Sequence, residues 1–514
     1  MTDHPNHKWI IAGTVMIGNI MAVLDSSIVN VALPDMAGNL GATVEEITWV
    51  VTGYILANVL IMPTVGMLSS RFGRKHLYMV AIAVFTVASM LCGLAGSLRV
   101  MVAFRVIQGL AGGVLVTVPQ AILRESFPPH EQGVAMGVYG MGVVIAPAIG
   151  PTLGGWITDA YSWPWIFYIN VPVGIINIFM VQRLIEDPPY LIRSKAKLDA
   201  LGLGFMIAGL GAFQLLLEEG EKDDWFQSGF IVRLAVVAAV GMGLFVWREL
   251  RTERPAVDLR VLKNLGFSAA TLMGGIMGAG LSGVLFILPL FLQNLLGFTA
   301  MDSGLALMPR SLAMLVMMPI AGRMYNRLGP RLMVSAGLLL IAYGYWALAD
   351  LTLDVGYWDL VWPQVWQGIG FSLLFAALST AALASIAKER MTAATGLYNV
   401  VRQVMGSIGI AAAATLLTHS EATYHASIVD TASGPVAQQW LAGTAAALQR
   451  AGSGAAVARE RALALLDAKV WQQATVLAYN HIFMLVALLF VAALPLVLLL
   501  RRSHHAGPVE MIAD

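Results

Sequence analysis

The stretch Leu24-Asp25-Ser26-Ser27-Ile28-Val29-Asn30-Val31-Ala32-Leu33-Pro34 places a carboxylate inside an apolar segment. Nearly all residues from Trp9 onward are apolar, so Asp25 falls in the second half of a membrane-length helix. A carboxylate there costs about 2.5 kcal/mol or more on insertion scales and is by default a functional-site hypothesis. The alternative is a structural hydrogen bond to a neighbouring helix. The main question that the sequence raises is therefore the role of Asp25.

The composition is that of a membrane protein. Of the 514 residues, 58% are hydrophobic and 12% are charged, whereas a soluble protein carries about 25% charged residues. The net charge of +1 argues against a nucleic-acid partner. The single cysteine, Cys92, lies in an apolar run and excludes disulfides and a cysteine-based metal site. The first apolar run continues to Leu33 without a small-residue cleavage pattern, so we expect an uncleaved first span and no signal peptide.

Apolar segments long enough to cross a bilayer recur along the whole chain. A helical span needs about 20 apolar residues, and by that measure the sequence predicts an all-α membrane protein with fourteen transmembrane helices. These cover residues 9–33, 46–68, 77–97, 100–123, 134–157, 165–185, 199–217, 229–247, 267–295, 304–325, 331–349, 358–386, 395–419 and 479–500. An even number of spans places both termini on the same side of the membrane.

The charges in the loops indicate which side that is. Basic residues gather in alternate loops, at Ser69–His76, Arg193–Lys197, Arg248–Lys263, Arg323–Arg331, Lys388–Arg390 and Arg501-Arg502. The intervening loops are neutral or acidic, at residues 35–46, 218–224 and 350–359. By the positive-inside rule, we expect both termini on the cytoplasmic side of the bacterial cytoplasmic (inner) membrane.

One connection, residues 420–478, is much longer than the others and lies on the outer side. Gly434-Pro435 and Gly452-Ser453-Gly454 divide it into two helical stretches, Val436–Gln449 and Ala455–Ala474. Two interpretations remain open. The connection is either a hairpin that lies on its own bundle or on the lipid headgroups, or a docking surface for another periplasmic or extracellular protein.

Two loops repeat one pattern and indicate an internal duplication. Gly66–Lys75 follows the second span and Gly322–Arg331 follows the tenth, each with two glycines seven residues apart. Equivalent positions for these loops give two six-helix bundles, at residues 9–185 and 264–500, with two additional spans at residues 199–247 between them. Internal duplication with a substrate site at the interface is typical of secondary transporters.

Five motifs give the chain a resemblance to a known family. They are Leu24–Pro34, Gly66–Lys75, Arg105-Val106-Ile107-Gln108-Gly109, Ala146–Gly155 and Trp165–Pro172. In this order and on these spans they resemble the major facilitator superfamily, and within it the fourteen-span drug:proton antiporters of the EmrB/QacA type. The resemblance covers essentially the whole chain. It implies export of lipophilic drugs in exchange for protons by alternating access.

Arg105 and Gln108 are candidate partners of Asp25. They share a helix face with Gly109 and Gly112, because residues three, four and seven apart align. At a rise of about 1.5 Å per residue, Arg105 lies ~8 Å and Asp25 ~12 Å from the outer ends of their spans. We therefore expect the two to pair directly, through water or through Gln108, since a buried guanidinium requires an acceptor. The resemblance implies that all three act in proton coupling; a purely structural ion pair is the alternative for Arg105.

The resemblance also implies that the Gly66–Lys75 loop gates the cytoplasmic side. The gating residues are expected to be Gly66, Arg71, Gly73 and Arg74. Ser70 stands where many members have aspartate, so the usual carboxylate–arginine latch needs a substitute. We expect helix-end dipoles or another acid, such as Glu125 or Glu131, to take that role.

The fifth span carries a glycine- and proline-rich motif that is typical of exporters in the resembling family. Its members here are Pro147, Gly150, Pro151, Gly154 and Gly155. Glycine faces permit tight contact between helices, and the resemblance implies that this run seals the bundle against leak. Ala146 stands where a glycine is usual.

Arg310 and Asn30 are candidates, with Asp25, for the substrate cavity. Arg310 lies about seven residues into the tenth span, at a depth close to that of Asp25. A cation there disfavours divalent metal ions and favours neutral or anionic lipophiles. Asn30 lies about 140° around the helix from Asp25, so we expect it to form an interhelical hydrogen bond.

Other chemistry finds no support in the sequence. Motifs for nucleotide binding, zinc binding and a nucleophile elbow are absent, so we predict a transporter and no enzyme, without cofactor or metal, driven by an ion gradient. The expected partners are lipophilic small-molecule drugs, protons and the lipid bilayer. Two alternatives remain: an exporter of an endogenous metabolite or siderophore, and the membrane subunit of a tripartite efflux conduit whose periplasmic adaptor meets residues 420–478.

Overall fold

The computed structural model is almost entirely helical, which confirms the predicted all-α class. It describes residues 7–188, 199–252, 255–384, 386–431 and 434–500, so the basic stretches Arg193–Lys197 and Arg501-Arg502 lie outside the described residues. The first half of the molecule consists of α1 (His7–Leu40), α2 (Val44–Ile47), α3 (Trp49–Ile61), α4 (Val65–Phe72), α5 (Arg74–Gly93), α6 (Leu98–Ser126), α7 (Gln132–Ala160), α8 (Trp165–Tyr168) and α9 (Asn170–Leu184). Two additional helices, α10 (Ala200–Glu219) and α11 (Gly229–Arg251), precede the second half. The second half consists of α12 (Leu265–Asn294), α13 (Ala300–Leu348), α14 (Tyr357–Ala384), α15 (Met391–Thr431), α16 (Pro435–Arg450) and α17 (Ala455–Ala492).

Thirteen helical segments in the described part of the chain are long and apolar enough to cross a membrane. The longest, Met301–Leu348, contains Gly329 with φ 72° and ψ 166°, which divides it into two crossings. With that division the structure has fourteen spans, as the sequence predicts. Gly73, at the end of α4, has φ 87° and ψ 151°. Only glycine adopts such angles without steric cost, so the two loops that share a sequence pattern also share a backbone turn.

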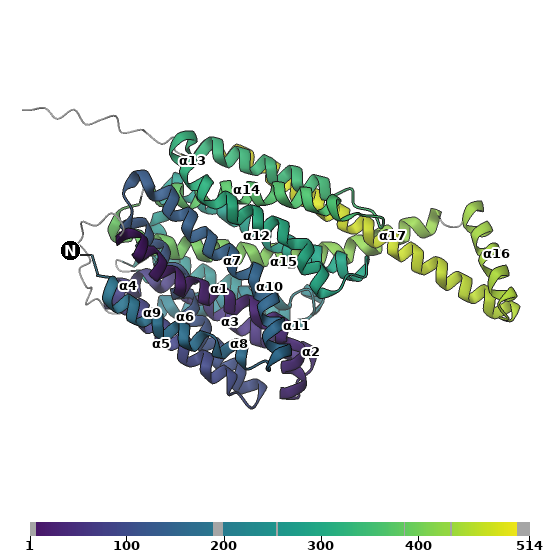
Figure 1. The fold of residues 1–514 in the computed structure, drawn as a ribbon, viewed down its shortest axis with the longest axis horizontal. Coiled ribbons are helices and arrows are strands. Elements are labelled where there is room, and N and C mark those ends of the chain that lie inside the picture. The colour runs from purple at the N-terminus through teal and green to yellow at the C-terminus, as the bar shows by residue number, and fades with distance from the viewer. Residues whose placement is uncertain (1–6, 189–198, 253–254, 385, 432–433, 501–514) are drawn as a thin grey trace, which may run out of the picture.

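The long outer connection forms an arm that projects from the bundle (Figure 1). α15 continues to Thr431, α17 begins at Ala455, and α16 joins the two at the far end of the arm. The sequence predicts a helix over Val436–Gln449, which α16 confirms. No residue of α16 is buried. The interpretation in which this hairpin lies on its own bundle is therefore wrong, because α15 and α17 carry it outward as continuous helices.

Glycines bring the two halves together on the side of the basic loops. Gly133 of α7 lies against the backbone of Gly322 of α13, and Gly66 of α4 lies against α15. Asn399 of α15 donates a hydrogen bond to Gln120 of α6 at 2.7 Å, and both side chains are buried. Small residues allow such backbone approach between membrane helices. The molecule is closed on this side.

The two additional helices pair with each other and bridge the halves. Asp199 caps α10 by accepting from Gly202 N at 3.1 Å, and it contacts Arg248 of α11 at 3.0 Å. The hydrogen bonds from Arg248 hold the pKa of the Asp199 carboxyl below its usual range. α10 packs against α3 of the first half. Gln214 of α10 donates to Ser407 of α15 at 2.7 Å, so α10 touches both halves.

The close contact between Gly133 and Gly322 predicts that Gly133→Val destabilises the closed arrangement. A Cβ at this position would lie 2.5 Å from Gly322 O, and overpacking of this kind costs about 1–3 kcal/mol. We expect the closed arrangement to lose population, so that a cysteine placed at Asn399 in a Cys92→Ser background reacts at least several-fold faster with a polar maleimide. Gly204→Val is the matched control, because nothing lies within 4 Å of that position. Equal labelling rates in the two variants would show that this contact does not control closure.

Candidate functional site

Asp25 lies at the centre of a buried hydrogen-bond network to which three helices contribute. Arg105 Nη1 of α6 contacts Asp25 Oδ2 at 2.5 Å, and neither side chain is exposed. Gln108 Nε2, one turn further along α6, donates to Asp25 Oδ1 at 2.8 Å. Asn170 Nδ2, at the start of α9, donates to the same oxygen at 3.0 Å. The structure therefore brings Asp25, Arg105 and Gln108 together, and Arg105 contacts Asp25 directly.

Arg105 is held by further contacts of its own. Its Nε donates to Val50 O at 3.1 Å, and its Nη1 also donates to Gln108 Oε1 at 2.8 Å. The guanidinium carbon lies 4.3 Å from the centroid of the Tyr54 ring, where the ring attracts a cation. Gly109 permits this arrangement, because a side chain at that position would collide with the Tyr54 backbone. The glycine on α6 thus sets how close the arginine lies to α3.

A proton on Asp25 would change both the hydrogen bonds and the charge balance of this network. The carboxylate of Asp25 accepts from three side chains on two other helices. Protonation adds an O–H donor to a carboxyl that otherwise only accepts, so it would change the hydrogen bonds around Asp25. It also removes the charge that balances Arg105, and a buried charge without its partner is strongly destabilising. Protonation of Asp25 is therefore linked to the relative positions of α1, α6 and α9.

Sequence reasoning missed Asn170, although it lies inside the motif Trp165–Pro172. Its side chain is buried and its Nδ2 reaches Ser89 Oγ at 3.1 Å as well as Asp25. An amide within an apolar span was the available signal, because a buried polar group needs partners. What the sequence does not give is which neighbouring helix supplies them.

Asn30 does not make the interhelical hydrogen bond that the sequence predicts. Its side chain is exposed, and its Nδ2 lies 3.5 Å from Ser26 O of its own helix. The expectation of an interhelical bond is therefore wrong. The face of α1 that carries Asp25 packs into the first half, whereas the face about 140° away does not.

Arg310 lies in the second half, on α13, and does not join Asp25. It is 2% exposed, and among the described residues no carboxylate pairs with it. Gly368 of α14 lies against the backbone of Arg310. Gly109 of α6 lies against Tyr54 in the same manner. Arg310 therefore occupies in the second half the place that Tyr54 occupies in the first.

A second pair of contacts repeats in the same way. Arg105 Nε donates to Val50 O in the first half. In the second half Gln364 Nε2 of α14 donates to Ala306 O at 2.6 Å. Gln364 thus stands where Arg105 stands in the first half. The two halves share one packing pattern but distribute their charges differently.

Arg74 of the predicted gating loop, Gly66–Lys75, pairs with an acid on another helix. Arg74 Nη1 contacts Glu125 Oε2 of α6 at 2.6 Å, with Arg74 buried. Ser70 Oγ instead donates to a carbonyl within its own helix at 2.8 Å, and Glu131 pairs with Lys8. Of the two acids that the sequence offers as substitutes, Glu125 is the one in contact with the loop. The other predicted gating residues, Gly66, Arg71 and Gly73, lie within or directly after α4.

The motif of the fifth span lies along α7, and its glycines face α1. Gly150 lies against Ser27, and Gly154 lies against Ile28 one turn further. Ser27 and Ile28 lie on one turn of α1, two and three residues after Asp25, so the motif fixes the distance between α7 and the helix that carries the carboxylate. The remaining members on α7 are Pro147, Pro151 and Gly155.

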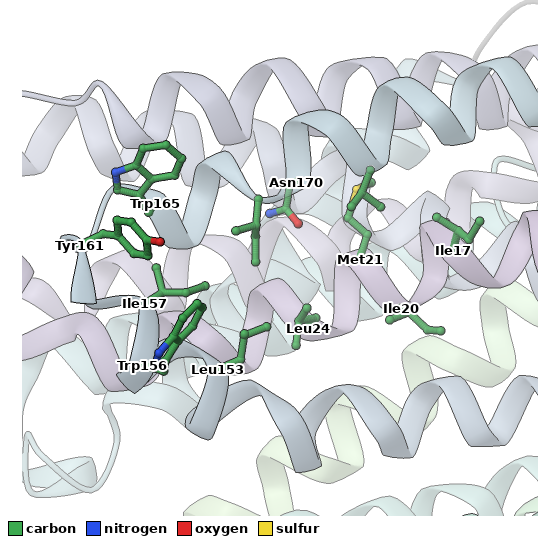
Figure 2. Close-up of a pocket in the computed structure, with 12 residues that line it drawn as sticks. Ile17, Ile20, Met21, Leu24, Leu153, Trp156, Ile157, Tyr161, Trp165 and Asn170 are labelled. Carbon is green, nitrogen blue, oxygen red and sulfur yellow. The ribbon is translucent and has the colours of Figure 1, made fainter. Parts of the chain in front are cut away.

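A cavity of about 640 Å³ opens between α1, α7 and α8–α9 (Figure 2). Its lining is almost wholly apolar and aromatic and includes Asn170, the partner of Asp25. The lining residues are Ile17, Ile20, Met21, Leu24, Leu153, Trp156, Ile157, Tyr161, Trp165, Ile169, Asn170 and Val173. Asp25, Asn30 and Arg310 are not among them, so their assignment to a substrate cavity stays a prediction.

Comparison with known proteins decides the family. The sequence profile of the Major Facilitator Superfamily matches residues 15–410. The chain belongs to the major facilitator superfamily. This superfamily is one of membrane transporters, and the many apolar helices make the chain a multi-pass membrane protein.

Curated relatives place this superfamily member with the EmrB type. The fatty acid resistance protein FarB of Neisseria gonorrhoeae is 35% identical over 95% of each chain. The multidrug export protein EmrB of Escherichia coli (strain K12) is 33% identical over 96% of this chain and 95% of its own. The colistin resistance protein EmrB of Acinetobacter baumannii is 30% identical over 78% and 79% of the two chains.

Solved structures share the fold. The human organic anion transporter MFSD10 (TETRAN) has a TM-score of 0.63 at 14% identity and covers 96% of this chain and all of its own. The proton:xylose symporter XylE has a TM-score of 0.59 at 13% identity, over 94% and 95% of the two chains. Both are major facilitator proteins in architecture; at this identity the likeness concerns the fold alone.

The buried pair of this major facilitator protein predicts a recovery of stability in a double variant. Arg105→Met leaves Asp25 buried without a counter-charge, which costs about 3–5 kcal/mol. The double variant Asp25→Asn/Arg105→Met removes both charges, so we expect it to be more stable than Arg105→Met in thermal unfolding of the purified protein. Arg233→Met, which removes an exposed arginine on α11, is the control and should unfold close to the wild-type temperature. A double variant less stable than Arg105→Met would show that the two charges do not depend on each other.

Proposed function

We propose that the protein exports lipophilic small molecules, drugs among them, in exchange for protons by alternating access. The observation that carries the proposal is the wholly buried Asp25–Arg105 pair inside the membrane-spanning part of the first half. The names of its relatives, a multidrug export protein and resistance proteins against colistin and fatty acids, support a lipophilic substrate range. An exporter of an endogenous metabolite or siderophore is the alternative within the same class.

Asp25 is the proposed proton site, with Arg105 and Gln108 as its coupling partners. Release of Arg105 on protonation shifts α1 against α6. α1 lies on α7 through Gly150, and α7 lies on α13 through Gly133, so the movement reaches the contact between the halves. The proton and the closure of the basic-loop side are in this way linked through two glycine contacts. Arg310 and Asn30 remain proposed substrate contacts.

We further propose that the protein lies in the bacterial cytoplasmic (inner) membrane with both termini in the cytoplasm. The basic loops gather on one side, as the positive-inside rule requires. Arg74 and Lys8 lie on that side, each paired with an acid. The closed side of this structure would then be the cytoplasmic side. Within the chain, residues 9–185 and 264–500 would form the two bundles that move against each other, with residues 199–247 as additional helices.

The projecting arm supports a second proposal, in which the protein is the membrane subunit of a larger conduit. Residues 420–478 would meet a periplasmic adaptor protein. The feature in favour is the length of α15 and α17 beyond the bundle, with no residue of α16 buried (Figure 1). Exposed apolar residues such as Val436 and Leu463 lie on this arm, where a partner would cover them.

Asp25→Asn tests the proton site. It keeps the size of the side chain but removes the charge, so we expect drug-driven proton movement in proteoliposomes to fall by at least a hundredfold while the protein remains folded. Asp159→Asn, which changes an exposed acid on α7, is the control and should transport as the wild type does. Normal exchange by Asp25→Asn would contradict the assignment.

Removal of α16 tests the conduit. A variant in which a short glycine–serine linker replaces Pro435–Arg450 should exchange drug for protons normally in proteoliposomes, because no residue of α16 is buried. In an efflux-deficient host it should confer much less resistance than the wild type, since the adaptor contact is lost. Equal resistance from the two proteins would contradict the adaptor proposal.

A further inference from the structure

The cavity of Figure 2 faces away from the contact between the two halves. All its lining residues come from α1, α7, α8 and α9, from the turn before α8 or from the junction between α8 and α9. Other residues of the first half contact the second half, such as Gly133 on α7 and Gly66 on α4. Trp156, Tyr161 and Trp165 at one end of the cavity are 59%, 64% and 50% exposed. The cavity therefore opens on the membrane-facing surface of the first half and is distinct from any central cavity between the halves.

The aromatic end of the cavity marks its orientation in the membrane. The ring centroids of Tyr161 and Trp165 are 5.7 Å apart, and those of Trp156 and Tyr161 are 6.0 Å apart. Clusters of this kind are enriched at the membrane–water interface. From there the cavity runs inward along α1 from Leu24 to Ile17, a distance of about 10 Å at the helical rise. Figure 2 shows Asn170 between the aromatic end and the Met21 end.

Asn170 gives this apolar cavity a polar contact point. Its Nδ2 has two hydrogens, and both have acceptors, Asp25 Oδ1 at 3.0 Å and Ser89 Oγ at 3.1 Å. Its Oδ1 is the atom left for a ligand, as an acceptor. A lipid acyl chain has no donor to offer, whereas a small molecule with an N–H or O–H group does. A volume of about 640 Å³ is within the usual range of about 300–1,000 Å³ for small-molecule sites.

We propose that this cavity binds a lipophilic small molecule from the bilayer, with an aromatic body and one hydrogen-bond donor. The body packs on Trp156, Tyr161 and Leu153, and the donor reaches Asn170 Oδ1. The inference rests on the proposed function and deepens it, because it places a substrate one side chain from Asp25. A ligand that binds Asn170 also acts on the Asn170–Asp25 hydrogen bond, which links occupancy of the cavity to the proton site.

Two substitutions one turn apart on α9 test the site. Val173 lines the cavity, whereas Ile176 does not and is 57% exposed. The probe is N-phenyl-1-naphthylamine, which has aromatic rings and one N–H, and its own fluorescence reports binding to the purified full chain in nanodiscs. We expect Val173→Trp to fill the cavity and weaken binding at least tenfold, and Ile176→Trp to bind within twofold of the wild type.

A second pair of substitutions, on the opposite wall of the cavity, keeps the test valid if one variant misfolds. Leu153→Trp fills the cavity from α7, and Ile149→Trp, at an exposed position on the same helix, is its control. Equal affinities within both pairs, or binding to the wild type no stronger than to empty nanodiscs, would overturn the proposal. Phenylnaphthalene, which lacks the N–H, should compete at least tenfold more weakly than the probe; equal competition would overturn the role of Asn170.

The same samples separate this inference from the proposed function. Proton movement is measured in proteoliposomes of the wild type and the four variants. Binding that responds to Val173→Trp supports the site even if the wild type moves no protons, and that result would count against proton-coupled export alone. If Val173→Trp and Leu153→Trp both exchange the probe for protons at the wild-type rate, the cavity is not a substrate site.

Discussion

The contact between Asp25 and Arg105 constrains the first half of this protein more than any other. Separating these two charges in the interior of a membrane bundle is costly, because the desolvation of one ion costs several kcal/mol in practice. The pair is therefore formed only if α1 and α6 lie at one relative depth and rotation. Gln108 and Asn170 then both donate to Oδ1 of the carboxylate. The proposed proton site is thus built from groups on three helices, so a change of charge at Asp25 would act on all of them.

The second half shows what the fold requires when the carboxylate is absent. Gly368 and Gln364 on α14 repeat the contacts that Gly109 and Arg105 make on α6. The packing is therefore independent of the ion pair. In the second half Arg310, on α13, is buried and has no acid partner among the described residues. An acid–base pair in the first half and a buried arginine without an acid in the second give the two halves different chemistry on one architecture, as expected if protons are handled in one half only.

Much of this organisation is readable in the sequence, for physical reasons. The length of apolar segments gives the spans, and the helical rise gives the depth of a residue, which is why Asp25 and Arg105 are expected to meet. Because Ser70 stands where many family members have aspartate, another acid is expected near the loop, and Glu125, one of the two candidates, contacts Arg74. The partner of a side chain is harder to predict than its depth. Its angle around its own helix does not say which neighbouring helix lies on that face. For that reason Asn30 was assigned an interhelical bond that it lacks, and Asn170 was not assigned to Asp25. Hydropathy also does not show whether a helix outside the membrane lies on the bundle or projects from it, so the outward projection of α16 could not be predicted.

The contacts between the halves on the basic-loop side include no ion pair described above, and this suits alternation between states. On the basic-loop side, Gly133 meets Gly322 and Gly66 meets α15 by close backbone packing. These glycine contacts are held mainly by dispersion, which falls off within a fraction of an ångström. The Asn399–Gln120 hydrogen bond on the same side is between uncharged groups, so these contacts separate without leaving charges unpaired. On the other side, α10 connects the halves through a hydrogen bond to Ser407 and through packing on α3. Because α10 touches both halves, a rocking movement must break one of its two contacts. The hydrogen bond is the costlier one to break without a replacement, so α10 and α11 should move with the second half and slide on α3. The additional helices are then part of the moving body and not a passive linker.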